Sequence, residues 1–239
     1  MRILSIDIGG SGLKASVIDE TGKMLTQRQR IETPHPCPPA VLLREVLALV
    51  KPLPEFDCIS VAFPGVVRDG KVLTAPNLGT ADWAGFDLGA ALGKSLGGKP
   101  VKIVNDAEMQ GLGLIDGKGL EFVLTLGTGA GTALFRDGVA APHMELGQHP
   151  AGHGHETYDG FIGRVALEKI GKHRWNKRVE KAIRQLDTLL NFDKLHIGGG
   201  NSKYVTFKLP PKARIESNDA GIEGGAKLWQ TPKKAPAKT

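Results

Sequence analysis

The chain has 239 residues, of which 41% are hydrophobic and 23% are charged, and its formal net charge is +6. This composition is that of an ordinary globular protein and excludes a disordered or fibrous chain. Two cysteines, Cys37 and Cys58, are too few for a disulfide framework or a four-cysteine zinc site. No run of residues approaches the ~20 apolar residues of a membrane span. Asp7 interrupts the apolar run that a signal peptide would need, so we expect a cytoplasmic protein with no membrane partner.

The end of the chain accounts for part of the basic charge. Residues 231–239 are rich in Pro, Lys and Ala, and three of them are lysines. Such a segment buries too little apolar surface to order itself, so we predict a disordered tail. The rest of the chain is then only mildly basic. Because it lacks a helix-turn-helix pattern, a zinc finger and a basic stripe with interleaved aromatics, we expect no nucleic-acid partner.

The first half of the chain predicts strands separated by turns and by one helix. We expect strands at residues 3–6, 13–18, 23–30, 57–63 and 101–104, and a helix at 41–50. A glycine-rich turn, Gly9-Gly10-Ser11-Gly12, joins the first two strands. Two later strands each end in a short segment, the tight turn Pro64-Gly65 and the polar pair Asn105-Asp106. A second helix follows Asp106.

The second half repeats the opening pattern about a hundred residues later. An apolar strand at 122–126 runs into Gly127-Thr128-Gly129-Ala130-Gly131, and a strand resumes at 132–135. This recurrence indicates two similar halves, as a duplication would produce. The remaining elements that we expect are helix over most of 161–190, a strand at 195–197 that ends in Gly198-Gly199-Gly200, and a helix at 220–229.

Both glycine loops place backbone N–H groups beside a hydroxyl residue, Ser11 or Thr128. Glycine lets the main chain approach a ligand closely, and successive N–H groups can cradle phosphate oxygens; the alternative is a plain turn. A dinucleotide-binding loop opens a helix, whereas both of these loops open a strand. Residues 89–95 come within one residue of a Walker A loop but follow no strand, so they predict a glycine-capped helix end.

Two charged side chains accompany the first loop. Asp7 ends the first strand, where a carboxylate would repel phosphate unless Mg²⁺ lies between them; the alternative is a carboxylate that caps the turn. Lys14 would add positive charge near a phosphate, or would simply be solvated.

Asn105 and Asp106 lie where a buried strand gives way to a helix. Ligands collect at the carboxyl ends of strands in α/β sheets. An Asp there can accept the proton of a hydroxyl that attacks a phosphoryl group. The alternative is that either residue caps the helix, and both roles can coexist.

Taken in order, these motifs resemble the ROK family of sugar kinases and sugar-sensing repressors, over nearly all of residues 1–229. The motifs are Asp7-Ile8-Gly9-Gly10-Ser11, Pro64-Gly65, Ala75-Pro76-Asn77-Leu78, Asn105-Asp106-Ala107, residues 126–131, Glu145-Leu146-Gly147 and Ile197-Gly198-Gly199-Gly200. The resemblance implies an α/β, actin-like (ribonuclease H-like) ATPase fold with two similar lobes and an interlobe cleft. We expect the lobes at residues 1–107 and 108–230. Because the repressors carry an extra N-terminal DNA-binding domain, the resemblance favours a kinase.

The resemblance also implies roles for individual residues. Asp106 would be the catalytic base for the sugar 6-hydroxyl, Asn77 and Asn105 would bind sugar hydroxyls, and Gly65 would shape the pocket. The residues expected to surround the phosphates are Asp7 with a tentative Mg²⁺, Gly9, Gly10, Ser11, Gly12, Lys14, Gly127, Thr128 and Gly129, with Gly199 and Gly200 near the distal part of the donor.

The sequence departs from the family in its sugar-binding and zinc motifs. Glu145 matches the Glu of the family's E-x-G-H motif, but Gln148 stands in place of the His. The cysteine-rich zinc motif is missing, so we expect no structural zinc. His149, His153 and His155 form either a replacement metal site or a solvated loop. Asp159 falls where the family has its third sugar-binding carboxylate.

A member without the zinc motif resembles the polyphosphate glucokinase branch, as does the basic segment 172–178. That segment would attract a polyanion, or would be an ordinary solvated helix face. We therefore predict a homodimeric kinase that transfers phosphate from polyphosphate, and from ATP as a second donor, to the 6-hydroxyl of glucose. The alternatives are a strictly ATP-dependent glucokinase or other hexose kinase, and a non-catalytic sugar sensor.

Overall fold

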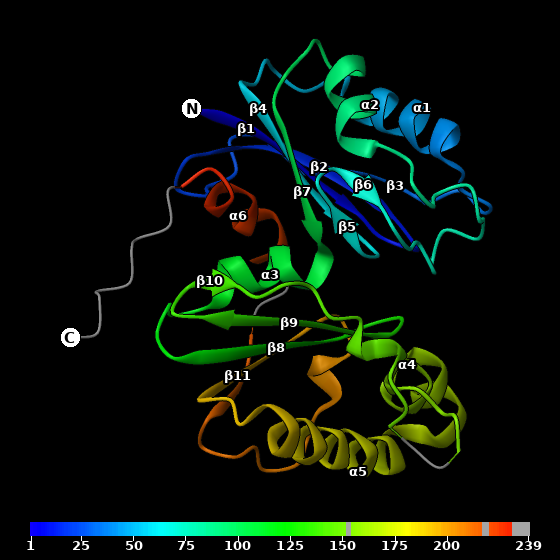
Figure 1. The fold of residues 1–239 in the computed structure, drawn as a ribbon, viewed down its shortest axis with the longest axis vertical. Coiled ribbons are helices and arrows are strands. Elements are labelled where there is room, and N and C mark those ends of the chain that lie inside the picture. The colour runs from blue at the N-terminus through cyan, green and yellow to red at the C-terminus, as the bar shows by residue number, and fades with distance from the viewer. Residues whose placement is uncertain (152–153, 217–219, 231–239) are drawn as a thin grey trace. The chain divides into compact units, whose positions relative to one another are not determined.

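The computed structural model describes residues 1–151, 154–216 and 220–230. The chain forms two compact units, one made of residues 1–113 and the last helix, and the other beginning at Leu114 (Figure 1). The predicted tail at 231–239 and His153 lie outside the described residues. None of the described helices combines the length and the apolar run that a membrane crossing requires.

The first unit is a five-stranded sheet with helices on both faces (Figure 1). Its strands are β1 (Arg2–Ile8), β2 (Leu13–Asp19), β3 (Gln29–Ile31), β4 (Cys58–Phe63) and β7 (Val101–Asn105), with a small separate ribbon of β5 (Val67–Arg68) and β6 (Lys71–Val72). Its helices are α1 (Pro39–Val50), α2 (Leu88–Ser95), α3 (Asp106–Leu114) and α6 (Ala220–Lys227).

Strand β1 is buried on both faces, which explains its almost unbroken apolar run. Successive side chains of a strand point to opposite faces. Leu4 and Ile6 therefore join the core beneath α1, whereas Ile3 belongs to the cluster beneath α6 with Ala226. The sheet thus lies between α1 on one face and α6 on the other.

The second unit repeats this plan. Its strands are β8 (Leu120–Leu126), β9 (Ala130–Arg136), β10 (Val139–Ala140), β11 (Lys194–Gly198) and β12 (Ala213–Ile215). Its helical elements are α4 (Tyr158–Ile162), α5 (Arg164–Leu190) and the short 3₁₀ turns η1 (Leu146–Gln148) and η2 (Ser202–Tyr204). The long helix α5 bends at Gly171, whose φ is 74°. Its Trp175, Val179 and Leu186 pack with Phe122 of the sheet.

Strand order confirms the predicted similarity of the two halves. The first sheet runs β3-β2-β1-β4-β7 and the second β10-β9-β8-β11-β12. Each sheet consists of three antiparallel strands followed by two strands that are parallel to the third. The predicted α/β fold class is therefore confirmed.

Three features differ from the sequence-based expectation. The strand expected at 23–30 is only β3, because it pairs with just three residues of β2, Leu13 to Ala15. The expected division after residue 107 falls inside α3, and the first unit continues to Gly113. Helix α6 packs on β1, β2 and β4 of the first unit, although we assigned it to the second lobe.

Candidate functional site

Three loops of the first unit emerge at one edge of its sheet. Strands β1, β4 and β7 are parallel, so their carboxyl ends lie together. These ends lead into Gly9–Gly12, Pro64-Gly65 and Asn105-Asp106. Ligand sites of α/β sheets lie at this edge, so the fold gathers the residues that the sequence singled out.

The first glycine loop is tightly packed. The Gly9 N–H donates to Gly12 O at 3.0 Å. A Cβ at Gly9 would lie 2.9 Å from that same oxygen, and a Cβ at Gly10 would lie 3.0 Å from Cβ of Asn77. A side chain at either glycine would therefore crowd its neighbours, and Asn77 lies beside Gly10.

Asp7 and Lys14 form an ion pair across the hairpin, with Lys14 Nζ 2.7 Å from Asp7 Oδ2. The two residues are register partners on β1 and β2. Their side chains are 23% and 34% exposed. Lys14 is therefore bound to a carboxylate rather than simply solvated, and Asp7 keeps access to solvent.

Asn105 is a buried connector between two of the loops. Its amide donates to Gly65 O at 3.2 Å, and its Oδ1 accepts from the Ala107 N–H at 2.8 Å. A Cβ on Gly65 would lie only 2.0 Å from Thr74 O, so this position admits glycine alone. The Asn105 side chain thus holds the Pro64-Gly65 turn against the start of α3.

Asp106 is the first residue of α3 and is half-buried. Its Oδ1 accepts from the Ala107 N–H at 2.8 Å. Asn105 and Asp106 both meet this N–H, so the expected capping interaction is present. The role of Asp106 as a base stays a prediction.

The second glycine loop is held through its carbonyl groups. Gly127 O accepts from Asn201 Nδ2 at 2.9 Å and from the Arg164 N–H at 3.1 Å, and Thr128 O accepts from the same N–H. Gly199, with φ of 84°, lies against β8: a Cβ there would be 2.4 Å from Leu126 O. The two expected donor-binding segments of this unit are therefore neighbours.

Asp159 ties this loop to the segment that holds Gln148. Its Oδ1 accepts from the Ala130 N–H at 2.7 Å, and its Oδ2 accepts from Gln148 Nε2 at 2.7 Å. Cβ atoms at Gly129 and Gly147 would lie 2.6 and 2.7 Å from Asp159, so both glycines make room for the carboxylate.

Burial and then the nearby Glu145 carboxylate raise the pKa of Asp159, against the lowering effect of its two hydrogen bonds. Glu145 Oε2 is buried and accepts no hydrogen bond from the described residues. Gln148 donates one amide N–H to Asp159, which leaves its carbonyl oxygen as an acceptor and its second N–H as a donor for a ligand. Glu145, Gln148 and Asp159 therefore form a group of acceptors suited to a ligand with several hydroxyl donors.

Residues 3–164 match the ROK family. The chain belongs to the ROK family. It is 31% identical to the polyphosphate glucokinase of Mycobacterium tuberculosis, over 92% of this chain and 88% of the relative. It superposes on the inorganic polyphosphate/ATP-glucomannokinase of Arthrobacter sp. strain KM with a TM-score of 0.85 and 30% identity, covering 95% of this chain and 97% of the other.

The ROK glucokinase of Streptomyces griseus, solved with glucose and AMPPNP, shares the fold at a TM-score of 0.75 and 21% identity, covering 95% and 99% of the two chains. The fold is thus the actin-like ATPase fold expected for a ROK protein.

In the described part of the structure, no group of three or more His, Cys, Asp or Glu residues could hold a metal ion. His149 Nδ1 lies 2.9 Å from Pro150 O, and its ring stacks on Tyr158. His155 is exposed.

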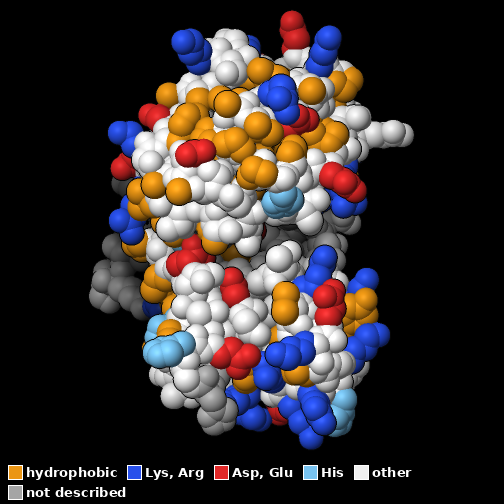
Figure 2. Space-filling view, turned by 90° about the vertical axis from the view of Figure 1, so that its right-hand side faces the viewer, with side chains coloured by type: hydrophobic (Ala, Val, Ile, Leu, Met, Phe, Trp, Pro, Cys, Tyr) orange, Lys and Arg blue, Asp and Glu red, His pale blue; other side chains and the backbone are white. Residues whose placement is uncertain are grey.

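The basic segment of α5 is amphipathic. Trp175 and Asn176 are buried, whereas Lys172, Arg174 and Lys177 are exposed. In the space-filling view, Lys and Arg side chains gather on the lower part, over the second unit (Figure 2). The segment therefore combines a core-facing side with a cationic outer side.

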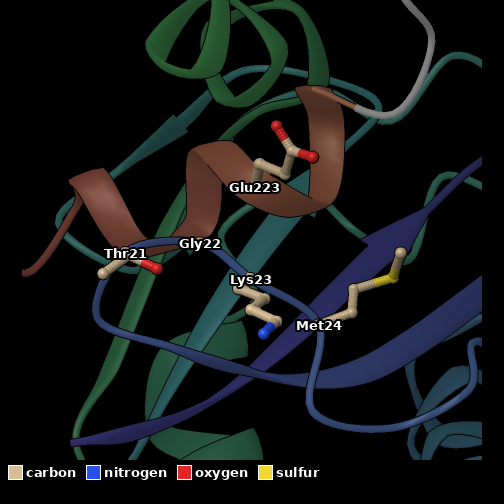
Figure 3. Close-up of a pocket in the computed structure, with 5 residues that line it drawn as sticks. All are labelled: Thr21, Gly22, Lys23, Met24 and Glu223. Atoms are coloured by element: carbon tan, nitrogen blue, oxygen red, sulfur yellow. The ribbon is translucent and has the colours of Figure 1, made fainter.

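Sequence reasoning missed two residues that bind the first glycine loop, Thr33 and His35. Their acceptors are backbone carbonyls, which leave no trace in the sequence. A hollow of about 460 Å³ at the turn after β2 is lined by Lys23 and Glu223, among others. These two side chains point in different directions, and none of the predicted site residues lines the hollow (Figure 3).

Proposed function

We propose that this ROK protein transfers a phosphoryl group from inorganic polyphosphate, or from ATP as a second donor, to the 6-hydroxyl of glucose. The observation that carries the proposal is the likeness to polyphosphate glucokinase over 92% of the chain. The Arthrobacter relative, whose description names both donors, supports the use of ATP as well.

In this proposal the acceptor group of the second unit binds glucose. Glu145 offers a buried oxygen without a protein partner in the described residues, and Gln148 offers its carbonyl oxygen. A buried acceptor left empty costs free energy, and a sugar hydroxyl would satisfy it. Asp159, and in the first unit Asn77, Asn105 and Gly65, complete the proposed sugar-binding set.

Asp106 acts as the general base. Its carboxylate takes the proton of the 6-hydroxyl while that oxygen attacks the terminal phosphorus. The bond between this phosphorus and the bridging oxygen of the donor breaks. The products are glucose 6-phosphate and a polyphosphate shorter by one phosphate, or ADP.

The glycine loops bind the donor through backbone N–H groups, from Gly9–Gly12 in the first unit and from Gly127–Gly129 with Gly199 and Gly200 in the second. Asp7 fits a Mg²⁺ site, because this metal is commonly held by one or two carboxylates and by phosphate oxygens, and Asp7 is a partly exposed carboxylate beside the loop. When bound, Mg²⁺ would neutralise charge on the phosphates. Lys14 holds the Asp7 carboxylate in place.

We extend the proposal to a homodimer that works in the cytoplasm without nucleic acid. Light scattering of the purified protein measures the oligomeric state, and a monomer at micromolar concentration would contradict the dimer.

The test is a coupled assay for glucose 6-phosphate with polyphosphate or ATP as donor. We expect turnover with both, and a fall in kcat of about 10²- to 10⁴-fold for Asp106→Asn. Asp69→Asn is the matched control, since Asp69 is exposed and its φ of 50° is tolerated by Asn.

Turnover with ATP alone would replace the polyphosphate proposal by an ATP-dependent glucokinase. Full activity of Asp106→Asn would remove Asp106 as the base. Glucose binding without turnover on either donor would favour a sugar sensor.

A further inference from the structure

The carbonyl groups of the first glycine loop are bound by two side chains from the segment after β3. Thr33 Oγ1 donates to Gly9 O at 2.6 Å. His35 Nε2 lies 2.6 Å from Gly10 O. Because a carbonyl oxygen can only accept, His35 must carry its proton on Nε2 in this contact.

These contacts fix which way the loop's N–H groups point. In a trans peptide the C=O and the following N–H lie in one plane and point in opposite directions. The only cis peptide in the described chain is His35-Pro36, so the Gly9-Gly10 and Gly10-Ser11 peptides are trans. Their carbonyls face Thr33 and His35, so the N–H groups of Gly10 and Ser11 face away from them.

Neither of these N–H groups donates to any of the described residues. The loop is closed by the Gly9 N–H, which donates to Gly12 O, while the Gly9 carbonyl accepts from Thr33. The Gly10 and Ser11 N–H groups are therefore two adjacent donors that the described residues leave unused.

The segment that carries Thr33 and His35 is itself firmly anchored. The Cys37 N–H donates to Leu78 O, and Trp83 Nε1 donates to Cys37 O, both at 2.9 Å. Thr33 is only 6% exposed, so water does not readily replace its hydroxyl. The two contacts therefore come from a fixed support.

A cation accompanies the open donors. The position of a Cβ on Gly12 would lie 3.3 Å from Nε of Arg30, so the guanidinium covers this end of the loop. Adjacent N–H groups and a nearby guanidinium together favour a bound anion.

We infer that Thr33 and His35 are positioning residues, which turn the Gly10 and Ser11 N–H groups toward a phosphate oxygen of the donor. The inference rests on the proposed function, because it gives the first loop the donor as its ligand. Thr33 and His35 bind the carbonyls of the loop and act through it.

The test separates the effect of each hydrogen bond on donor binding from the effect of side-chain shape. Thr33→Val and His35→Leu remove the donor groups, whereas Thr33→Ser and His35→Gln keep one. We expect the first pair to raise KM for tripolyphosphate by about three- to tenfold, the range of one hydrogen bond, and the second pair to stay within about twofold. KM for glucose at saturating donor should not change in any variant.

Titration calorimetry with tripolyphosphate, without glucose, gives a second measurement. The dissociation constant should weaken in Thr33→Val and His35→Leu by the same factor as KM. Thermal unfolding checks that each variant is folded, and His35 is exposed, so His35→Leu keeps the test available if Thr33→Val does not fold.

An unchanged KM and dissociation constant in folded His35→Leu would overturn the inference. Equal losses in Thr33→Ser and His35→Gln, or an equal rise in KM for glucose, would also overturn it. A wild-type protein that binds tripolyphosphate but has no turnover would instead refute the proposed function, and calorimetry would still test the two positioning residues.

Discussion

The two hairpins that open the two units share a backbone plan but differ in charge. In the first, Asp7 and Lys14 face each other across β1 and β2 as an ion pair. Counted back from the glycine loops, the equivalent positions of β8 and β9 are Thr125 and Gly131, which also face each other. The repeated fold therefore supplies two loops, and only the first has a carboxylate and an ammonium group at its base.

The loops are also supported differently. In the first, side chains bind two carbonyls and leave the N–H groups of Gly10 and Ser11 unused by the described residues. In the second, the Ala130 N–H is taken by the Asp159 carboxylate. A carboxylate against a loop disfavours a phosphate oxygen at that point. From this comparison we expect the first loop to bind an anion, whereas the second loop is also tied to the acceptor group through Asp159.

A third pair of positions follows the last strand of each sheet. Asp106 follows β7 as the first residue of a helix. Glu216 follows β12, and its carboxylate binds His196 and Arg214. The same place in the fold thus holds the proposed base in one unit and a structural ion pair in the other.

Of the predicted effects, replacing His196 should give the largest loss of stability. The substitution removes a contact of Glu216, the second-unit counterpart of Asp106. His196 is fully buried, with Nε2 2.9 Å from Glu121 and Nδ1 2.7 Å from Glu216. His196→Leu leaves the buried Glu121 carboxylate without this partner, which we expect to cost about 3–5 kcal/mol in the free energy of unfolding. Urea unfolding measures the loss.

Ser60 is the matched control, because it occupies the equivalent position on β4. Its hydroxyl donates to Gly225 O and accepts from Trp229 Nε1. Ser60→Ala removes these uncharged contacts and should cost about 1–3 kcal/mol. If His196→Leu were no more costly than Ser60→Ala, the hydrogen bonds of His196 with Glu121 and Glu216 would not be a main support of the second unit.

Two glycines of the second loop should differ in their tolerance of a methyl group. A Cβ on Gly129 meets the Asp159 carboxylate, whereas a Cβ on Gly127 meets nothing within 4 Å. Gly129→Ala should displace Asp159, cost about 1–3 kcal/mol of stability and raise KM for glucose. Gly127→Ala should change KM for glucose by less than about twofold, as expected of an open site. Steady-state kinetics of the two variants measure the difference. Equal changes in KM for glucose would contradict the prediction.

The smallest expected effect is a dependence of stability on pH. The pKa of Asp159 is raised above its usual 3.8, first by burial and then by Glu145. The stabilising contribution of the protonated form is therefore complete below pH 3.8 and is lost as the pH rises through the raised value. Asp159→Asn does not titrate, so it should gain stability relative to wild type over this interval.

Urea unfolding of wild type and Asp159→Asn from acidic to neutral pH measures this difference. A variant that lost stability relative to wild type as the pH rose would contradict the expected sign.

Local patterns predicted the duplicated part of the fold well. Apolar strands that end in glycine loops are visible at 3–12 and 122–131 because neighbouring residues make them. Contacts between residues far apart in the sequence could not be predicted. Glycines 224 and 225 reveal small residues in a helix, but not that these pack on Met109 and Ser60 of the first unit.

The candidate site divides in the same way. Asp106 and the glycine loops are recognisable from their place after strands. The bond between Gln148 and Asp159 joins residues 11 apart, and the hydrogen bond of His196 with Glu121 joins residues 75 apart. Thr33 and His35 act on carbonyls, which every residue carries, so no residue type marks their partners.

Helix α6 has a consequence for how the chain is made. The N-terminal sheet keeps Ile3, Ile18 and Cys58 in a cluster that Ala226 completes. During synthesis this face stays uncovered until more than two hundred residues have left the ribosome. The unit that is translated first is therefore among the last to be finished, and the second unit can fold while the first still waits for its final helix.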